Sequence, residues 1–300
     1  TLQGAVMALV AVILPIGALM AAGGPGGVWQ TLSATMPEAY LHPTGGRSLV
    51  PFLAFAFGIA AIGLGTLGQP HLMARLMAVK DERARKAGFT IAMSWGVLVF
   101  TGMGILALSA RALLAPLDDP EAVFYAMAAA LLPTVLAGIV IAAILSAVMS
   151  TVDSLLMAAS AAAAHDLRLT RVLPGREVLI GRCVMALICA LAVILTLTVD
   201  NTIFDRVLFS WSALGAAFGP VIAARVCKVE PAGGAIIAAI VLGFGLTVIF
   251  YSFGQVDPAT AGEGLRGLMV RLAAIPGDPF ERIVPWLMPL LLVFSWRQRA

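Results

Sequence analysis

Residues 145–160 read LSAVMSTVDSLLMAAS, and this stretch is the most informative about the fold. On a helical wheel of about 100° per residue, its polar side chains gather within about 120° of one another. The opposite face is bulky and apolar. The pattern predicts a helix with one small, hydroxyl-bearing face. That face consists of Ser146, Ser150, Asp153, Ser154 and Ser160, flanked by Ala147 and Thr151.

Two interpretations of the hydroxyl-bearing face remain open. Small residues let helices pack closely, and a hydroxyl can bond the carbonyl four residues earlier in its own helix. That would account for Ser146 and Ser160, but not for Asp153, because a carboxylate in a membrane span is costly unless it faces water, a partner or an ion. Hydroxyl and carbonyl oxygens are hard donors with little charge. They suit a monovalent cation that must bind and then leave.

The rest of the composition is typical of a membrane protein. Of the 300 residues, 61% are hydrophobic and 12% are charged, whereas soluble chains carry about 25% charged residues. Uncharged runs such as Ala232–Ser252 are too long to hide in a soluble core of this size. The composition excludes a soluble enzyme, a disordered tail and a nucleic-acid-binding domain. Cys183, Cys189 and Cys227 lie in apolar runs without metal-ligand spacing, so we expect buried free thiols.

The apolar runs predict a polytopic, all-α membrane protein. A bilayer core of roughly 30 Å needs about 20 apolar helical residues, and eight runs qualify within a single transmembrane domain over residues 1–300. The last run is the weakest, being short and holding Pro285 and Pro289. The predicted spans are 4–22, 50–67, 88–110, 130–158, 178–199, 205–226, 233–252 and 281–296.

The distribution of charge predicts the orientation. With the N-terminus of this chain inside, 13 of the 19 Lys and Arg residues fall on the inner side and ten of the 16 acidic residues fall outside. Cytoplasmic loops of membrane proteins carry an excess of Lys and Arg. We therefore expect a multi-pass protein of the cell (inner) membrane with both ends of this chain cytoplasmic. The Gly- and Pro-rich loops 23–49 and 253–280 would face out, with room for short surface helices.

Three stretches in register resemble the sodium/solute symporter family. Residues 147–151 (AVMST), followed by Ser154 and by HDL at 165–167, resemble that family's sodium-site helix. Residues 68–71 (GQPH) and 209–220 (FSWSALGAAFGP) resemble two further segments in order and spacing. With the similarity of residues 1–20 to the family's sixth helix, the resemblance covers nearly the whole chain up to about residue 252.

The resemblance implies a fold and a function. The family has the leucine-transporter fold, and this chain would hold the last helix of repeat one, all of repeat two (about 50–226) and two following helices. It would be a partial leucine-transporter-like inverted-repeat helix bundle, and the missing N-terminal helices of the same protein are expected partners. The implied function is that of a secondary active transporter, not an enzyme. It would carry out sodium-coupled symport of a small organic solute, an amino acid such as proline or a small carboxylate.

The resemblance also implies the ion site, with Na⁺ as the coupling ion. The sodium ligands would be the Ala147 carbonyl and the side-chain oxygens of Ser150 and Thr151. A second ion site or a gating role is the interpretation for Ser146, Asp153 and Ser154. No nucleic acid is expected among the partners, which are the solute and the lipid bilayer.

The solute pathway is expected where glycine and proline loosen a span and free its carbonyls. The Gly63–Pro70 cluster predicts such a break. The pathway residues would be Ile62, Gly65, Thr66, Gln69, Pro70 and Trp211. Ile62 and Thr66 stand where proline-transporting members of the family carry aromatics, which predicts a different or less closely held solute. For Trp211, the alternative to a role in the solute pathway is helix packing or anchoring at the membrane interface.

Two alternative functions remain open from the sequence. Some members of the family are fused to signalling kinases, so the chain could be a membrane sensor or a transport-derived module of a signalling protein. It could also be an inactive fragment, since it opens on Thr1 without an initiator Met and we expect it to be a piece of a longer protein.

Overall fold

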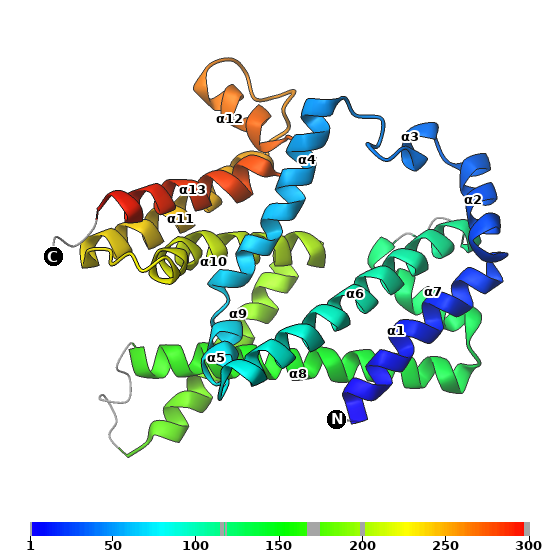
Figure 1. Ribbon diagram of the computed structural model, residues 1–300, viewed down its shortest axis with the longest axis horizontal. Helices are drawn as coiled ribbons and strands as arrows, with labels where there is room; N and C mark the ends of the chain where they lie inside the picture. The colour runs from blue at the N-terminus through cyan, green and yellow to red at the C-terminus, as the bar shows by residue number, and fades with distance from the viewer. Residues whose placement is uncertain (1, 115–116, 118, 167–174, 199–201, 297–300) are drawn as a thin grey trace. The chain divides into compact units, whose positions relative to one another are not determined.

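The computed structural model describes residues 2–114, 117, 119–166, 175–198 and 202–296, and its regular elements are helices (Figure 1). The all-α prediction is therefore confirmed. The N-terminal half holds α1 (Leu2–Ala21), α2 (Gly24–Thr35), α3 (Glu38–Leu41), α4 (Leu49–Ala61), the 3-10 helix η1 (Ile62–Gly68), α5 (Pro70–Met77), α6 (Glu82–Leu113), the 3-10 helix η2 (Pro120–Ala122) and α7 (Val123–Leu131). The C-terminal half holds α8 (Thr134–Asp166), α9 (Glu177–Thr198), α10 (Ile203–Val226), α11 (Gly233–Gly254), α12 (Leu265–Ala273) and α13 (Pro279–Ser295).

Within the described residues, six helical segments are long and apolar enough to cross a membrane, which confirms a polytopic membrane protein. They are Leu49–Gly68, Glu82–Leu113, Thr134–Ala164, Glu177–Thr198, Ile203–Val226 and Gly233–Gly254. The predicted span 4–22 coincides with α1, whose residues Met7–Ala21 form a pair with α2 bent by 64°. The predicted span 281–296 coincides with α13, which has 17 residues. At 1.5 Å per residue that is roughly 25 Å, so a crossing by α13 stays a prediction.

One predicted boundary was wrong. The span predicted at 130–158 begins instead at Thr134, because α7 ends at Leu131 and Leu132 is extended, with φ −109° and ψ 145°. A residue before proline is driven out of the helical region by the proline ring, and Pro133 follows Leu132. The break thus has a local cause that an apolar run does not reveal.

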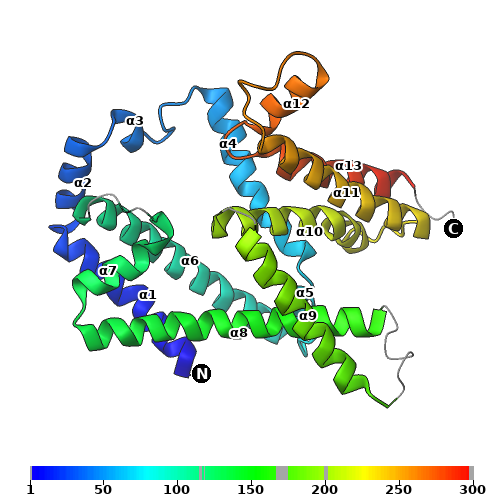
Figure 2. The same ribbon diagram turned by 180° about the vertical axis from the view of Figure 1, so that it is seen from behind.

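The chain divides into two compact units, each described here by itself. Unit 1 comprises Thr1–His42 and Ala78–Val199. In it α1 lies along α6 and also packs against α7 and α8, while α9 crosses α8 (Figure 2). The inward faces of these helices bury one apolar cluster. It consists of Val10, Leu14, Ala18, Leu106, Ala110, Met127, Ala128 and Val140.

Unit 2 comprises Pro43–Met77 and Asp200–Ala300 and is organised around α10. This helix packs against η1, α11 and α13, and α13 also packs against α11 and α4 (Figure 1). The face of α10 that these neighbours cover is lined by small residues. They are Ala213, Gly215, Ala216, Ala217, Gly219 and Ala224, all buried.

Backbone meets backbone where η1 crosses α10, and we call this contact the glycine seam (Gly65, Gly68 and Gly215). A Cβ on Gly215 would lie 2.6 Å from the Gly65 Cα, and a Cβ on Gly68 would overlap the Leu214 carbonyl. Helices in lipid gain their association from such close packing of small residues, since lipid tails are as apolar as leucine. The seam therefore fixes η1 against α10.

Much of the apolar surface faces outward, as expected for helices in lipid. In α9, Leu187, Val193 and Leu197 are 60%, 57% and 81% exposed. The three cysteines are free, as predicted, but they are exposed rather than buried. The prediction of burial was wrong because an apolar run in a membrane protein can face acyl chains instead of a protein core.

The predicted orientation and the predicted single domain are not decided by these helices. Four of the basic residues counted on the inner side, Arg168, Arg171, Arg297 and Arg299, lie outside the described residues, as does Leu167 of the HDL motif. The loop before α6, which was predicted to lie inside, carries a defined helix start, because the Asp81 carboxylate accepts from the Ala84 N–H at 2.7 Å and caps α6. The loop regions 23–49 and 253–280 carry short helices as expected, α2, α3 and α12.

Gly68→Ala is expected to destabilise unit 2, since its new methyl group would overlap the Leu214 carbonyl. Overpacking of this kind costs about 1–3 kcal/mol. Gly63→Ala is the matched control in the same helix, because nothing lies within 4 Å of a Cβ at Gly63. The measurement is the melting temperature of the purified full-length protein in detergent. Equal melting temperatures for the two variants would contradict the glycine seam.

Candidate functional site

The sodium ligands implied by the resemblance lie on the middle of α8, in unit 1. The Thr151 hydroxyl donates to the Ala147 carbonyl at 3.1 Å, and the Ser154 hydroxyl donates to the Ser150 carbonyl at 3.0 Å. Ser150 and Thr151 are exposed, while Ala147 is half-buried. A hydroxyl that donates its proton keeps two lone pairs on the same oxygen. The back-bond of Thr151 therefore leaves an oxygen acceptor on the outside of the helix.

The neighbouring polar residues of α8 divide between the two interpretations. Ser160 is 6% exposed and bonds the Met157 carbonyl at 3.1 Å, which favours packing for this residue. Ser146 and Asp153 are exposed and Ser154 is half-buried. In the described part of the chain no ion pair involves Asp153, so a second ion or a gating role for it stays a prediction.

The predicted helix break is present in unit 2. The α-helix α4 gives way to the 3-10 helix η1 at Ile62, and Gln69 is extended, with φ −84° and ψ 110°. Pro70 follows and starts α5, which accounts for the extended Gln69. The Thr66 hydroxyl donates to the Gly63 carbonyl at 2.7 Å within the break. Glycine lowers helix stability by about 1 kcal/mol relative to alanine, so three glycines in seven residues weaken the α-helix where it gives way to η1.

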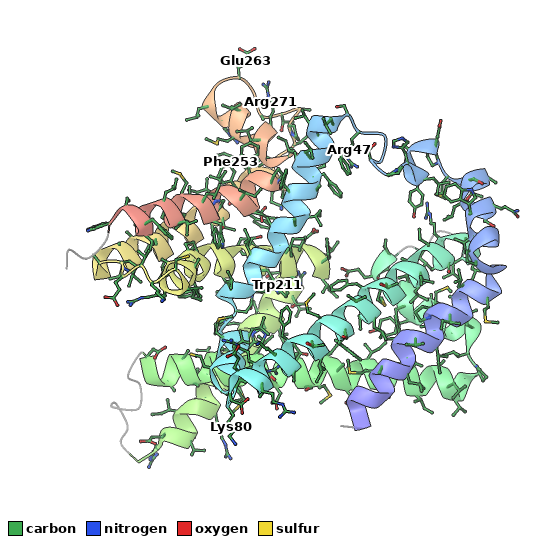
Figure 3. All side chains as sticks on the ribbon, in the orientation of Figure 1. Arg47, Lys80, Trp211, Phe253, Glu263 and Arg271 are labelled. Carbon is green, nitrogen blue, oxygen red and sulfur yellow. The ribbon has the colours of Figure 1, made fainter. Side chains whose placement is uncertain are left out.

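The structure brings two predicted pathway residues, Gly65 and Trp211, together at the glycine seam. A Cβ on Gly65 would lie 2.8 Å from the Trp211 carbonyl oxygen and 3.0 Å from the Trp211 Cβ. Ile62, Thr66 and Trp211 are half-buried, and Pro70 is exposed. Trp211 thus takes part in helix packing through its backbone and Cβ, and the residue as a whole is only half-buried; Figure 3 labels its position.

Gln69 is the most deeply buried of the predicted pathway residues, at 4% exposed. Its Nε2 group is inaccessible and finds no hydrogen-bond acceptor among the described residues. Buried amide groups are nearly always paired, and leaving one unpaired costs about 1–3 kcal/mol. An unpaired buried amide beside a helix break is a group that can bind a ligand.

His71 follows the break on α5. Its Nδ1 is buried and has no hydrogen-bond partner in the part of the chain that is described. Burial lowers the pKa of His71 below its ordinary value, and the positive charge of Arg75 lowers it further. The imidazole is therefore neutral at pH 7 and adds no charge near the break.

A polar cavity that was not foreseen from the sequence lies between α10, α11 and α13 in unit 2. Its volume is about 340 Å³. The Phe209 and Tyr251 rings lie 4.4 Å apart on one side, and the Asp278 and Arg282 side chains form an ion pair of 2.6 Å on another. Burial raises the pKa of the Asp278 carboxyl, and the charge of Arg282 opposes this rise.

The signal that could have revealed Arg282 is its spacing from Asp278. An acid and a base four residues apart face each other on a helix, and here they bracket the start of the weakest predicted span. Arg282 also donates through Nη1 to the Gly58 carbonyl at 3.2 Å. That contact joins residues 224 positions apart, which no local pattern predicts.

This chain is similar to one family of known proteins and to several of its members. The family model described as "Sodium:solute symporter family" matches residues 1–247. The osmoregulated proline transporter OpuE of Bacillus subtilis (strain 168) is 30% identical over 280 residues, covering 91% of this chain and 56% of that protein. The high-affinity proline transporter PutP of the same organism is 29% identical over 264 residues, covering 85% and 54%.

A more distant similarity is to the sodium/proline symporter of Staphylococcus aureus, which is 28% identical over 235 residues, covering 73% of this chain and 44% of that protein. The chain spans about half the length of the curated relatives it matches. No solved structure gives a significant match.

Gln69→Leu is expected to leave the melting temperature of the full-length protein unchanged or to raise it, since it removes a buried amide that has no acceptor. Thr247→Val is the contrast in unit 2, because the fully buried Thr247 hydroxyl is paired with the Gly243 carbonyl at 3.0 Å. Its loss is expected to cost about 0.5–1.5 kcal/mol. Thermal unfolding in the absence of solute compares them. Gln69→Leu destabilising more than Thr247→Val would show that the Gln69 amide is structural.

Proposed function

This chain belongs to the sodium:solute symporter family, and from that premise we propose that the protein is a secondary active transporter that couples sodium entry to uptake of a small organic solute. The observation that carries the proposal is the family match over residues 1–247. The family and the relatives it resembles are transporters, not enzymes. The chain is a multi-pass membrane protein with several apolar helices of spanning length.

Sodium binding on α8 is the first part of the proposal. Na⁺ is a hard cation that prefers oxygen ligands. We assign to it the Ala147 carbonyl and the Ser150 and Thr151 hydroxyls. The Thr151 hydroxyl donates its hydrogen bond to the Ala147 carbonyl. The Thr151 hydroxyl oxygen and the Ala147 carbonyl oxygen each keep a lone pair that can bind an ion. Neutral oxygens hold a monovalent ion without binding it too tightly to release. Ser146, Asp153 and Ser154 lie within two turns and are the proposed second ion or gating group.

The solute site is the second part of the proposal. Broken spans in transporters expose backbone groups to substrates near mid-membrane, and η1 is such a break. We assign Ile62, Gly65, Thr66 and Gln69 to it, with Trp211 contacting Gly65 across the seam; Pro70 ends the break. The names of the relatives make proline the first solute to test. Because Ile62 and Thr66 are not aromatic, we expect a different solute, or proline held less closely than in proline-transporting members of the family.

The coupling follows from linkage. An ion and a solute that favour the same conformation raise each other's affinity by the same factor. Coupling free energies of this kind are about 1–3 kcal/mol. We propose that sodium on α8 favours the conformation in which η1 accepts solute, and that the sodium gradient then drives both into the cell. The proposed setting is the inner cell membrane, with both ends of this chain cytoplasmic.

Ser150→Ala and Thr151→Ala are each expected to raise the sodium concentration for half-maximal uptake about tenfold, the effect of losing one polar ligand. Thr198→Ala on α9 is the matched control, because the Thr198 hydroxyl makes the same back-bond, to Ile194 at 2.8 Å. The measurement is initial uptake by the full-length protein at varied sodium. Sodium dependence unchanged in both α8 variants would remove the proposed site.

Uptake itself decides between transporter, sensor and inactive fragment. Proteoliposomes holding the full-length protein are expected to accumulate radiolabelled proline, another amino acid or a small carboxylate when sodium is placed outside. Replacing sodium by potassium at the same ionic strength is the control and should abolish accumulation. Binding of solute without accumulation would favour a sensor. No binding and no accumulation for any solute would favour an inactive protein.

A further inference from the structure

A carbonyl in α4 loses its helical partner where the helix breaks. The Ile62 N–H donates to Ile59 and Ala60 instead of to Gly58, four residues back. In a membrane protein each backbone group freed in this way must be satisfied by the protein. The Gly58 carbonyl accepts from Arg282 Nη1 at 3.2 Å, in a buried setting. Arg282 therefore supplies the donor that the break removes.

The Arg282 guanidinium is held in a position from which it can donate to the Gly58 carbonyl. The Arg282 side chain is 3% exposed, and its Nη2 donates to the Asp278 carboxylate at 2.6 Å. A planar guanidinium presents several donors in a fixed fork, whereas a lysine ammonium is a single point charge on a flexible stem. One arm of the fork meets Asp278 and the other meets Gly58. The ion pair thus aims the second arm at the carbonyl.

The turn between α12 and α13 brings Arg282 to α4. Gly277 has φ +89°, and a Cβ on Gly277 would lie 2.7 Å from the Phe55 carbonyl oxygen. A Cβ on Gly58 would in turn overlap the Gly277 carbonyl. Asp278 has φ +49°, a conformation that Asp and Asn tolerate better than other side chains. The turn lies directly on the α4 backbone one turn before η1 begins.

We propose that Arg282 is a positioning residue for the solute site, which fixes where α4 ends and so where Ile62, Thr66 and Gln69 lie. The inference rests on the proposed function for its transport consequence and on contacts within unit 2 for its geometry. Arg282 lies beyond residues 1–247, the part that matches the family model. The flanking α12–α13 hairpin is then part of the solute site's support.

The first test measures how accessible the helix break is to a thiol reagent, and it does not depend on transport. In a full-length protein in which every cysteine, Cys183, Cys189 and Cys227 among them, is replaced by serine, Ala61→Cys places a thiol at a buried position beside the break. Arg282→Gln is expected to raise the rate of maleimide labelling at this thiol roughly tenfold, the effect of leaving one buried polar group unpaired. Arg282→Lys should restore part of the protection, and Asp278→Asn should give a smaller rise.

The matched control is Arg271→Gln on α12, whose guanidinium is exposed and makes a 3.4 Å contact with the Gly262 carbonyl (Figure 3). It should leave labelling unchanged. A second reporter, Ala239→Cys on α11, lies at a fully buried position away from the break. An equal rise at both reporters would show general loosening and would overturn the positioning role. An unchanged rate at Ala61→Cys would overturn it as well.

The second test measures the KM and the maximal rate of solute uptake. Arg282→Gln is expected to raise the KM for solute about tenfold with a much smaller change in the maximal rate, because a displaced site loses ground-state binding. A fall in maximal rate alone would contradict the proposal. If the unmodified protein shows no sodium-driven uptake, the proposed function fails, and the labelling experiment still decides the role of Arg282.

Discussion

The close backbone contact between η1 and α10 is the constraint on which the rest of unit 2 depends. Where an α-helix in a membrane span changes to a 3-10 segment, and where that segment ends, backbone groups lose their helical partners and lipid cannot satisfy them. Such a segment persists only where protein lies against it. Gly65, Gly68 and Gly215 allow that approach because none of them carries a Cβ. The same contact places Trp211 beside the break, so packing and the proposed solute site share one set of residues.

Polar groups in the two units differ in whether their hydrogen bonds are satisfied. On α8 the hydroxyls of Thr151 and Ser154 bond their own helix, which satisfies their protons, and the exposed Thr151 oxygen keeps lone pairs that can accept. At the η1 break, Gln69 and His71 carry buried nitrogens without partners among the described residues. The first arrangement provides neutral oxygens, as a monovalent cation requires. The second leaves hydrogen-bonding capacity unused, as a binding site requires before its ligand arrives.

The sequence predicted the features whose cause is local. Apolar runs of spanning length predicted the helices, and the Gly63–Pro70 cluster predicted a break, which the structure has at η1 (Ile62–Gly68). The boundary at Leu132–Pro133 was missed although its cause is local, because hydropathy averages over a single proline. Burial of the three cysteines was predicted wrongly, since hydropathy does not distinguish a protein core from lipid. The Arg282–Gly58 bond joins residues far apart in the chain, so only the folded structure reveals it.

The most direct test is hydrogen–deuterium exchange of the full-length protein in sodium and in potassium at equal ionic strength. The central claim is that the turn Ala147–Thr151 of α8 offers its oxygens to sodium. Slower exchange of the backbone amides around this turn in sodium than in potassium is the predicted result. Equal exchange in the two salts at sodium concentrations that support uptake would contradict it.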